Sequence, residues 1–397
     1  MTIDLDKARQ VFEESTDFTV GLEEEFALLD PQSLSLVTEF ERLFQLAQRD
    51  EVLAESVAGE LISSEIEIRS GKGADFADAV ERQQERRNRL FELVASEGVA
   101  LGATGAHPWS PWQEQRIIDT EHYRRVEEGL KYVAWRNNTF SLHVHIGVRG
   151  ADRAIAVCDA LRPVLPTLLA VSANSAWVEE RFSGLHSART QIFTKSFPRC
   201  GVPDFFGSWK SYEDYVTFLL ETESIVEHTQ LWWSVRPHFG FGTVEVRIMD
   251  AQSRGGESTA LAALVSACVM QSALDFDAGI APADFPPRLV EENMWRAIRH
   301  GLDGKQIDLA SGEQVAARAA VERLLEWTTP ARQAANLDDH LEGLRAALEA
   351  GNGAQRQWRA QEAGEEMREI FASTVEDTRS TYTTRAAAGA AKQEVAR

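Results

Sequence analysis

The stretch Thr-Phe-Ser-Leu-His-Val-His-Ile-Gly-Val (139–148) alternates between polar and apolar side chains, as a half-buried β-strand requires. His143 and His145 are two residues apart, so they leave such a strand on the same face. The opposite face carries Leu142, Val144 and Ile146. The stretch therefore predicts a strand with one apolar face and one face that presents two imidazoles.

A second stretch follows the same rule. It reads Gly-Thr-Val-Glu-Val-Arg-Ile-Met-Asp (242–250). Glu245 and Arg247 share one face of the predicted strand, and the apolar residues Val244, Val246 and Ile248 share the other. Apolar residues toward helices and charged residues toward a cavity form a sensible layout for a site built on a sheet.

The first strong strand of the chain is predicted at 18–30, Phe-Thr-Val-Gly-Leu-Glu-Glu-Glu-Phe-Ala-Leu-Leu-Asp, and it closes at an Asp-Pro turn. Glu23 and Glu25 share a face with Gly21. Glu24 falls on the apolar face, and the sequence offers no account of it.

A third acidic strand is predicted at 60–70, Glu-Leu-Ile-Ser-Ser-Glu-Ile-Glu-Ile-Arg-Ser. Glu65, Glu67 and Arg69 line one face, while isoleucines line the other. Carboxylates again gather on one side of a strand.

Further strands are predicted at 99–105 and 231–238, and amphipathic or buried helices occur along the whole chain. Residues 111–138 resist assignment, and 176–210 are rich in loops. The pattern predicts an α+β fold, with a mixed, largely antiparallel sheet in the first two thirds and a helical last third. The predicted helices are 39–54, 75–97, 152–174 (kinked at Pro163 and Pro166), 212–220, 257–276, 288–303, 313–327, 338–350 and 356–373.

The net charge, the cysteines and the apolar runs of the sequence limit the expected binding partners and the expected location of the protein. A net charge of −21 repels nucleic acid and anionic membranes, so neither is an expected partner. Cys158, Cys200 and Cys268 are too few and too scattered for a disulfide framework, and the N-terminus lacks a signal-peptide pattern. The most apolar helical runs, 164–171 and 260–274, fall short of the roughly 20 residues that a membrane-spanning helix needs. We therefore expect a cytoplasmic protein.

Carboxylates with one imidazole suit an oxygen-rich site for magnesium or manganese. The alternative is that these groups are solvated positions on a half-exposed antiparallel sheet. Several separate strands repeat the same acidic face, which favours a site, because buried like charges are tolerated only with cations. The candidate ligands are Glu23, Glu25, Glu60, Glu67, His143 and Glu245.

Other kinds of chemistry lack support. His-X-His also occurs in zinc hydrolases with barrel folds. The sequence around the later histidines does not alternate between strand and helix patterns, which argues against such a hydrolase. The sequence contains no G-x-x-x-x-G-K-[ST], no G-x-G-x-x-G and no G-x-S-x-G, and Cys200 in a loop is read as incidental. Arg189 and Arg247 could each bind a phosphate or a carboxylate. The alternative for each is a salt bridge at the protein surface. The position of Arg247 on a predicted strand favours the binding role for that residue.

A set of ordered motifs is similar to the glutamate–cysteine ligase type 2 family, also called carboxylate–amine ligases. The resemblance covers roughly residues 18 to 380, which we take as one catalytic domain between an N-terminal arm (1–17) and a flexible Ala-rich tail (381–397). The motifs are Gly-Leu-Glu-Glu-Glu-Phe (21–26), Glu-Ile-Glu-Ile (65–68), Gly-Ala-His-Pro (105–108), Leu-His-Val-His-Ile-Gly-Val (142–148), Ser-Ala-Asn-Ser (172–175), Arg-Thr-Gln-Ile-Phe (189–193), Trp-Trp-Ser-Val-Arg-Pro-His (232–238), Gly-Thr-Val-Glu-Val-Arg (242–247) and Glu-Asn-Met-Trp-Arg-Ala-Ile-Arg-His-Gly-Leu-Asp (292–303).

The resemblance implies a glutamine-synthetase-like fold, in which the concave face of a curved antiparallel sheet holds ATP, two or three divalent ions (Mg2+ or Mn2+) and a carboxylate substrate, and helices pack on the other face. It implies ATP-dependent amide bond formation through an acyl phosphate, with glutamate and cysteine as default substrates. Arg247 would meet the transferring phosphoryl group and, with Glu67, bind the nucleotide; Arg189 is a second candidate for substrate or phosphate. By the same resemblance, the metal ligands would be Glu23, Glu25, Glu60, Glu67, His143 and Glu245.

Three departures from the family pattern affect substrate identity. Ser234 stands where the family usually has Asp, Arg69-Ser70-Gly71 replaces a small residue and Thr-Pro, and the loop 183–188 differs. Two alternatives stay open. One is phosphoryl transfer to a guanidino or other small acceptor, since related sheets occur in guanidino kinases. The other, which Ser234 and Arg69 motivate, is a metal- and nucleotide-binding protein without catalysis. The expected partners are small amino-acid or other carboxylate and amine molecules, and a homo-oligomer is one expectation, since an exposed edge of such a sheet often pairs.

Overall fold

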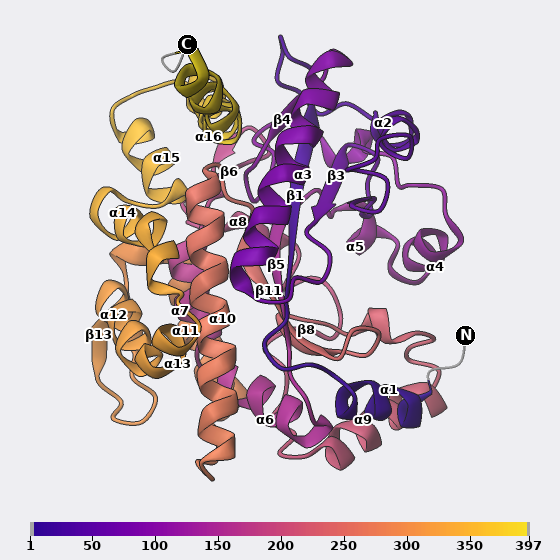
Figure 1. The fold of residues 1–397 in the computed structure, drawn as a ribbon, viewed down its shortest axis with the longest axis vertical. Helices are drawn as coiled ribbons and strands as arrows, with labels where there is room; N and C mark the ends of the chain where they lie inside the picture. Colours follow the sequence, from indigo (N-terminus) through magenta and orange to yellow (C-terminus); the bar gives the residue numbers. More distant parts are fainter. Residues whose placement is uncertain (1–3, 395–397) are drawn as a thin grey trace.

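The computed structural model describes residues 4–394, with side chains through residue 380. Within these residues the main sheet has seven strands in the order β10-β11-β5-β1-β3-β2, and β4 pairs with the last residues of β1 (Figure 1). All of its pairings are antiparallel. Its strands are β1 (Val20–Leu29), β2 (Val57–Ala58), β3 (Glu65–Arg69), β4 (Ala100–Gly102), β5 (Ser141–Gly147), β10 (Val235–His238) and β11 (Thr243–Asp250).

Helices supply most of the remaining structure. Small two-stranded sheets are also present, in which β6 pairs with β7, β8 with β9 and β12 with β13. The α-helices are α1 (Leu5–Glu13), α2 (Phe40–Ala47), α3 (Phe76–Ser96), α4 (Glu121–Leu130), α5 (Tyr132–Trp135), α6 (Ala151–Leu161), α7 (Leu165–Ser172), α8 (Ala188–Ile192), α9 (Trp209–Glu221), α10 (Gly255–Asp277), α11 (Pro287–His300), α12 (Ala317–Trp327), α13 (Thr329–Ala334), α14 (Glu342–Ala350), α15 (Gly353–Glu362) and α16 (Met367–Glu394). The 3-10 helices are η1 (Trp112–Glu114), η2 (His228–Gln230), η3 (Gly301–Asp303) and η4 (Asp338–His340), and the short strands are β6 (Trp177–Val178), β7 (Arg181–Phe182), β8 (Cys200–Gly201), β9 (Trp232–Trp233), β12 (Lys305–Ile307) and β13 (Gln314–Ala316).

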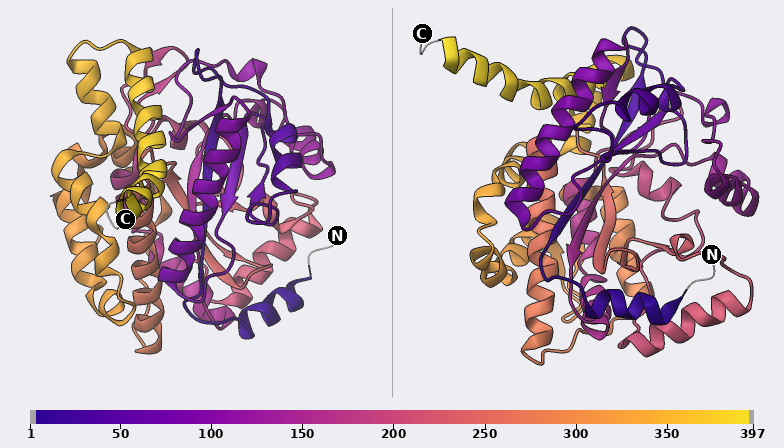
Figure 2. Two further views of the ribbon diagram at one scale, coloured as in Figure 1. Left: turned by 45° about the horizontal axis from the view of Figure 1, so that its top comes forward. Right: turned by 45° about the vertical axis from the view of Figure 1, so that its right-hand side comes forward.

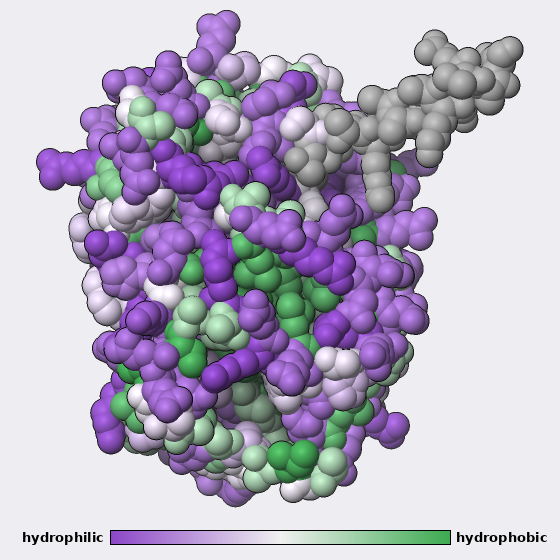
Figure 3. Space-filling model, turned by 90° about the vertical axis from the view of Figure 1, so that its left-hand side faces the viewer, coloured by the Kyte–Doolittle hydropathy of each residue, from purple (hydrophilic) through white to green (hydrophobic). Residues whose placement is uncertain are grey.

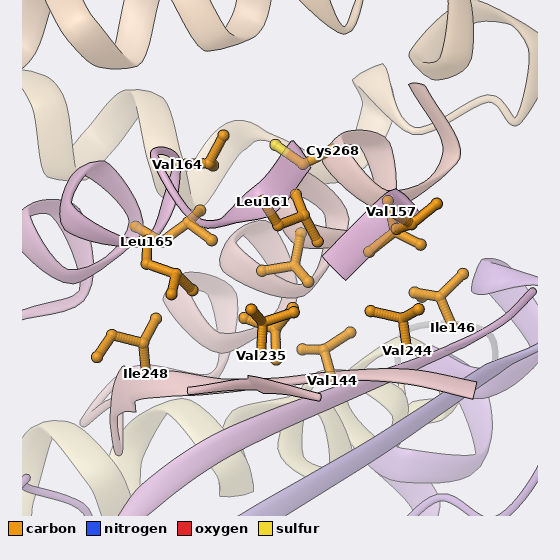
Figure 4. Packing of buried hydrophobic residues seen from close by; sticks show 14 of the residues in the cluster. Val144, Ile146, Val157, Leu161, Val164, Leu165, Val235, Val244, Ile248 and Cys268 are labelled. Atoms are coloured by element: carbon orange, nitrogen blue, oxygen red, sulfur yellow. The ribbon is translucent and has the colours of Figure 1, made fainter. Parts of the chain in front are cut away.

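One face of the sheet is apolar and packs on helices. Val144, Ile146, Val244 and Ile248 point from β5 and β11 toward α6, α7 and α10 (Figure 4). Each such side chain contributes about 1.5–3 kcal/mol on burial. This packing holds the sheet against the helices and leaves its other face for polar residues, so the predicted α+β fold is confirmed.

The C-terminal helices form a second layer behind α10. Figures 1 and 2 show α12, α14 and α15 on the side of α10 that faces away from the sheet. The outer surface of this layer is mainly hydrophilic, with apolar side chains visible in its hollows (Figure 3). The predicted helical last third is therefore present, although β12 and β13 interrupt it.

The central helix α10 corrects one expectation. The sequence suggested an apolar run too short to cross a membrane, but α10 has 23 residues and is long and apolar enough to do so by length and composition. In the fold, however, 78% of its most apolar window is buried inside the protein. Core helices of soluble proteins share this character, and here the apolar surface of α10 is used against the sheet and the other helices.

Several predicted boundaries differ from the structure. Glu60 precedes β3 in a loop, because a turn at Ser63 and Ser64 separates it from the strand. The predicted strand 231–238 is divided into β9 and β10, and the predicted helix 356–373 is divided into α15 and α16, with Gly364 at φ +84° between them. Residues 314–316 form a strand instead of the start of a helix. The predicted kink of 152–174 is correct: α6 and α7 are bent by 60°.

Glu24, which the sequence left unexplained, has a structural role on the apolar face. It is buried, and both of its carboxylate oxygens accept hydrogen bonds from Nη1 of Arg87 at 3.0 and 2.8 Å. Nε2 of Gln83 donates to the same carboxylate at 2.8 Å. Both partners lie on α3, so this ion pair ties α3 to β1.

Candidate functional site

The charged face of the sheet forms the floor of a chamber of about 260 Å3. Five glutamates and four arginines line this chamber, together with aromatic and hydroxyl side chains. The charged lining residues are Glu23, Glu25, Glu60, Glu65, Glu245, Arg69, Arg189, Arg236 and Arg247.

The register of the strands brings these groups together. Glu23 of β1 lies directly opposite His143 of β5 and opposite Arg69 of β3. Glu25 lies opposite Glu67. Because opposed residues in an antiparallel pair lie about 4.5–5.5 Å apart, strand pairing alone brings Glu23, Glu25, Glu67 and His143 together.

His143 lies at the centre of the cluster. Its Nδ1 lies 3.2 Å from Oε2 of Glu23, and its Nε2 lies 2.7 Å from Oγ of Ser141 and 3.6 Å from Oε1 of Glu25. Burial and the nearby charge of Arg247 lower the pKa of His143. The lowered pKa favours the neutral imidazole, which is the form that binds metal ions.

Two groups of three side chains could each bind a cation. Within each group, the three donor atoms lie within 4.8 Å of one another. The groups are Glu23, His143 and Glu245, and Glu25, Glu67 and His143. His143 belongs to both, and because a neutral imidazole has one free nitrogen lone pair, it could be a ligand of only one of two neighbouring ions.

The carboxylates from β3 and the loop before it are only partly compensated by cations, since Arg69 pairs with Oε1 of Glu67 alone. Burial raises the pKa of Glu67 well above its usual value, and the charges of Glu23 and Glu60 raise it further. Burial and then Glu25 raise the pKa of Glu60 to about 7. Oε2 of Glu67 is buried and has no hydrogen-bond partner among the residues that the structure describes. Such a carboxylate is stabilised by a cation.

Glu245 has the opposite environment. Arg236 holds it in a bidentate pair, with Nε–Oε2 at 2.7 Å and Nη2–Oε1 at 3.3 Å, and Nη1 of Arg247 also pairs with Oε1. Burial alone would raise the pKa of Glu245, but Arg236 and Arg247 hold it well below its usual value. Nε of Arg247 is buried and without a partner in the described part of the chain, so an anion could bind there.

Arg189 is fixed by the irregular part of β11. A bulge interrupts the β5–β11 pairing between Val246 and Met249. Nη1 and Nη2 of Arg189 donate to the carbonyl oxygens of Ile248 and Arg247, at 3.1 and 3.2 Å. The guanidinium is thereby locked, with Asp250 at 3.9 Å.

A second, more apolar cavity of about 380 Å3 adjoins the chamber. It lies beside the start of β1 and the turn between β10 and β11, and it is lined partly by the glycine backbone of Gly21, Gly71 and Gly240. The two cavities share the wall formed by Glu23, Arg69, His145 and Phe241. Phe241 is 60% exposed and stacks on His238.

The structure brings every residue singled out from the sequence to one place. Glu23, Glu25, Glu60, Arg189, Glu245 and Arg247 line the chamber, and Glu67 and His143 lie just beneath its surface. The sequence reading assigned no role to Glu65, Arg69, His145 or Arg236, which also line it. The first three shared a strand face with predicted residues, which was an available signal; Arg236 could be found only from its pairing opposite Glu245.

Comparison with known proteins gives a consistent family. A family model described as Glutamate-cysteine ligase family 2 (GCS2) matches residues 19–377. Three similar relatives carry the name “Putative glutamate--cysteine ligase 2” or a numbered form of it. The protein of Solibacter usitatus is 35% identical over 91% of this chain and 93% of its own. Those of Rubrobacter xylanophilus and Sorangium cellulosum are 37% and 38% identical over 86% of this chain, and over 87% and 90% of theirs.

Solved structures support the same fold. A glutamate–cysteine ligase from Francisella tularensis in complex with AMP has a TM-score of 0.67 at 12% identity, with 93% of this chain and 90% of that chain covered. A bifunctional glutathione synthetase from Pasteurella multocida has a TM-score of 0.67 at 13% identity; 95% of this chain matches 54% of that one.

Proposed function

The chain belongs to glutamate–cysteine ligase family 2, and on that premise we propose that this ATP-dependent ligase joins the carboxylate of one small molecule to the amine of another through an acyl phosphate. Glutamate and cysteine, giving γ-glutamylcysteine, are the default pair because of the family alone. The observation that carries the proposal is the pair of overlapping ligand groups on one sheet face, with Arg247 paired to Glu245 of one group.

The two steps of the reaction explain why such a face is useful. First, a carboxylate oxygen attacks the γ-phosphorus of ATP, the bond to the bridging oxygen breaks, and ADP leaves. Next, the amine nitrogen attacks the acyl carbon, the acyl–oxygen bond breaks, phosphate leaves, and the nitrogen loses a proton to solvent. Charge develops on phosphoryl oxygens in the first step, so catalysis depends on positioning and charge neutralisation.

Arg247 is suited to that neutralisation. Its Nη1 is paired with Glu245, which orients the guanidinium, whereas its Nε has no partner in the described residues. A guanidinium stays charged at any relevant pH and binds phosphoryl oxygens through directed N–H groups. Arg236 pairs with the other side of Glu245 and so keeps this carboxylate in place.

The donor set fits Mg2+ or Mn2+. Carboxylate oxygens with one neutral imidazole are the ligands that these ions accept, and the unpartnered Oε2 of Glu67 is an oxygen of this kind. Glu23 and Glu245 would hold one ion and Glu25 and Glu67 a second, with His143 as a further ligand of one of them and Glu60 beside them. When bound, such ions would neutralise phosphate charge and hold the phosphates in line for transfer.

The neighbouring apolar cavity supports the use of a nucleotide. We propose that the base and ribose of ATP lie there, beside Phe241, and that the triphosphate extends past Arg69 into the acidic chamber. This arrangement needs neither a P-loop nor a Rossmann turn, which the sequence lacks. A reaction in the cytoplasm is consistent with three free thiols, Cys158, Cys200 and Cys268.

The deciding experiment measures ADP release with Mg2+ or Mn2+ against a panel of amino acids, singly and in pairs. We expect ADP and an amide product only when a particular carboxylate and amine are both present. A stable phosphorylated product would instead establish a kinase. Binding of ATP without ADP formation across the panel would count against the proposal and favour a non-catalytic protein or substrates outside the panel. A stable phosphorylated product would overturn the proposal.

A further inference from the structure

One wall of the chamber is formed by the short helices α4 and α5 and the residues beside them. These helices lie on the side of the sheet opposite α10 (Figures 1 and 2). His122, Tyr123 and Val126 of α4 line the chamber. Thr229 of η2 and Trp232 of β9 also line it. The chamber is therefore enclosed by two segments that are far apart in the sequence.

The segment that carries α4 and α5, residues 120–136, is lightly packed. Within the described chain, α4 buries Val126 alone and α5 buries Ala134 alone. Both residues belong to a small apolar cluster that is separate from the two large cores. Tyr132 and Trp135 are 57% and 41% exposed. A segment with so little buried apolar surface can open at a low cost in free energy, without unfolding of the cores.

A hydrogen bond joins this segment to the opposite wall. Nδ1–H of His122 donates to Oε1 of Glu227 at 2.9 Å, between residues that are 105 positions apart. Glu227 also caps η2, in a capping box with Gln230. Trp232 packs against the small apolar cluster from the same side. The hydroxyl of Tyr123 makes a different contact: it donates to the carbonyl oxygen of Gly59, in the loop before Glu60.

The segment on the far side of this hydrogen bond supports the charged face of the sheet. Nη1 of Arg236 donates to the carbonyl oxygens of Leu231 and Thr229, at 2.6 and 3.4 Å. Nε of the same guanidinium pairs with Glu245 at 2.7 Å. A movement of η2 therefore changes the support of Arg236, and the closure of residues 120–136 is connected to the position of a proposed metal ligand.

We propose that residues 120–136 form a lid, which opens to admit ligands and closes through the hydrogen bond between His122 and Glu227. The closed lid protects the acyl phosphate from water. Without it, a water oxygen attacks the acyl carbon, the acyl–oxygen bond breaks, phosphate leaves, and the carboxylate is regained with loss of a proton to solvent. This protective role rests on the proposed ligase function, whereas opening of the lid requires no turnover.

The first experiment measures amide hydrogen exchange in the intact protein. His122→Leu removes the donor, whereas His122→Asn keeps an N–H group close to the position of Nδ1. We expect the α4 amides to exchange about three- to tenfold faster in His122→Leu, since a hydrogen bond to a carboxylate is lost. In His122→Asn the rates should stay within about twofold of wild type. Leu is a better helix former than His, so faster exchange would not reflect helix propensity.

The second experiment measures the ratio of amide product to ADP, using the substrate pair that the ADP-release panel identifies. Wild type and His122→Asn should give a ratio of about one. In His122→Leu the ratio should fall below about one half, because part of the acyl phosphate is hydrolysed. A purely structural role of His122 would lower both products together and leave the ratio at one.

The amides of α10 are the reference for both outcomes. Equal α4 exchange in wild type and His122→Leu would overturn the lid. An equal acceleration of exchange in α4 and α10 would also overturn it, because the hydrogen bond would then stabilise the whole fold. A ratio of one in His122→Leu, despite faster α4 exchange, would overturn the protective role. If no substrate pair releases ADP, the ligase proposal fails alone, and hydrogen exchange still decides whether the lid exists.

Discussion

Two paired strands, β1 and β3, show two ways to bury a glutamate. Glu24 points to the apolar face of β1, where Arg87 and Gln83 of α3 hydrogen-bond its carboxylate. On the charged face, Glu67 lies opposite Glu25, and its Oε2 has no partner in the described residues. Both glutamates are buried, so burial does not distinguish them.

The two glutamates differ in how completely the chain itself compensates the negative charge of the carboxylate. The Glu24 cluster (Glu24, Gln83 and Arg87) is completed by the chain itself and joins a helix to the sheet. In the carboxylate cluster (Glu25, Glu60, Glu65 and Glu67), Arg69 pairs with Oε1 of Glu67 but leaves its Oε2 without a partner in the described residues. Burial and the acidic neighbours raise the pKa of Glu60, Glu65 and Glu67. A buried charge left uncompensated costs several kcal/mol, so a protein that retains several of them is built to receive cations.

The largest expected effect comes from breaking the Glu24 cluster. Arg87→Met leaves Glu24 buried without its cation and should lower the free energy of unfolding by about 3–5 kcal/mol. Urea denaturation would measure this loss. The double variant Glu24→Met with Arg87→Met removes both charges and should recover most of the stability. If the double variant were as unstable as Arg87→Met, the pair would not act as a unit.

On the charged face, the same kind of change should affect activity instead of stability. Glu67→Gln removes a proposed metal ligand, so kcat/KM for ADP release should fall by about 10²-fold or more. Its free energy of unfolding should stay within about 1 kcal/mol of wild type, because removal of a buried carboxylate among acidic neighbours offsets the loss of its ion pair with Arg69. Wild-type kcat/KM in this variant would contradict the ligand assignment.

A histidine extends the comparison to pH. His107 is buried and neutral: its Nε2–H donates to the carbonyl oxygen of Leu34 at 2.8 Å, and its Nδ1 accepts from Ser110 N at 2.9 Å. Burial lowers its pKa to about 4 from 6.5. The unfolded chain therefore binds a proton first as pH falls, and stability that is full above pH 6.5 is lost toward pH 4.

By pH 5 this loss amounts to about 2 kcal/mol. Urea denaturation between pH 7 and pH 5 should show it as a steeper decline in wild type than in His107→Gln, whose side chain does not titrate. Equal slopes for the two proteins would show that His107 does not contribute.

The smallest effect is stabilisation by metal ions. Mn2+ or Mg2+ at tenfold above its dissociation constant should raise the free energy of unfolding by about 1.4 kcal/mol, since the ion binds the folded state. Thermal denaturation with and without the ion would detect the shift. The shift should shrink in Glu67→Gln and persist in the Glu24/Arg87 double variant. A full shift in Glu67→Gln would place the ion elsewhere.

The sequence predicted strand faces better than strand limits. The alternation in 18–30, 139–148 and 242–250 assigned each ligand-type side chain to its face, because a strand has a period of two whatever surrounds it. Glu60 was expected on a strand and lies in a loop; the turn at Ser63 and Ser64 that separates it has no strong breaker. Its approach to Glu25 and Glu67 depends on how that loop folds back, which is a long-range property.

The sequence by itself thus determined which side chains share a face, because that property is local and periodic. Tertiary structure decided which faces meet: the register that sets Glu23 against His143, the pairing of Arg236 with Glu245, and the bulge that locks Arg189. It also decided why Glu24 is tolerated, since Arg87 lies 63 residues away in the chain. Such contacts depend on strand pairing and helix packing between distant segments, and no local pattern in the sequence encodes them.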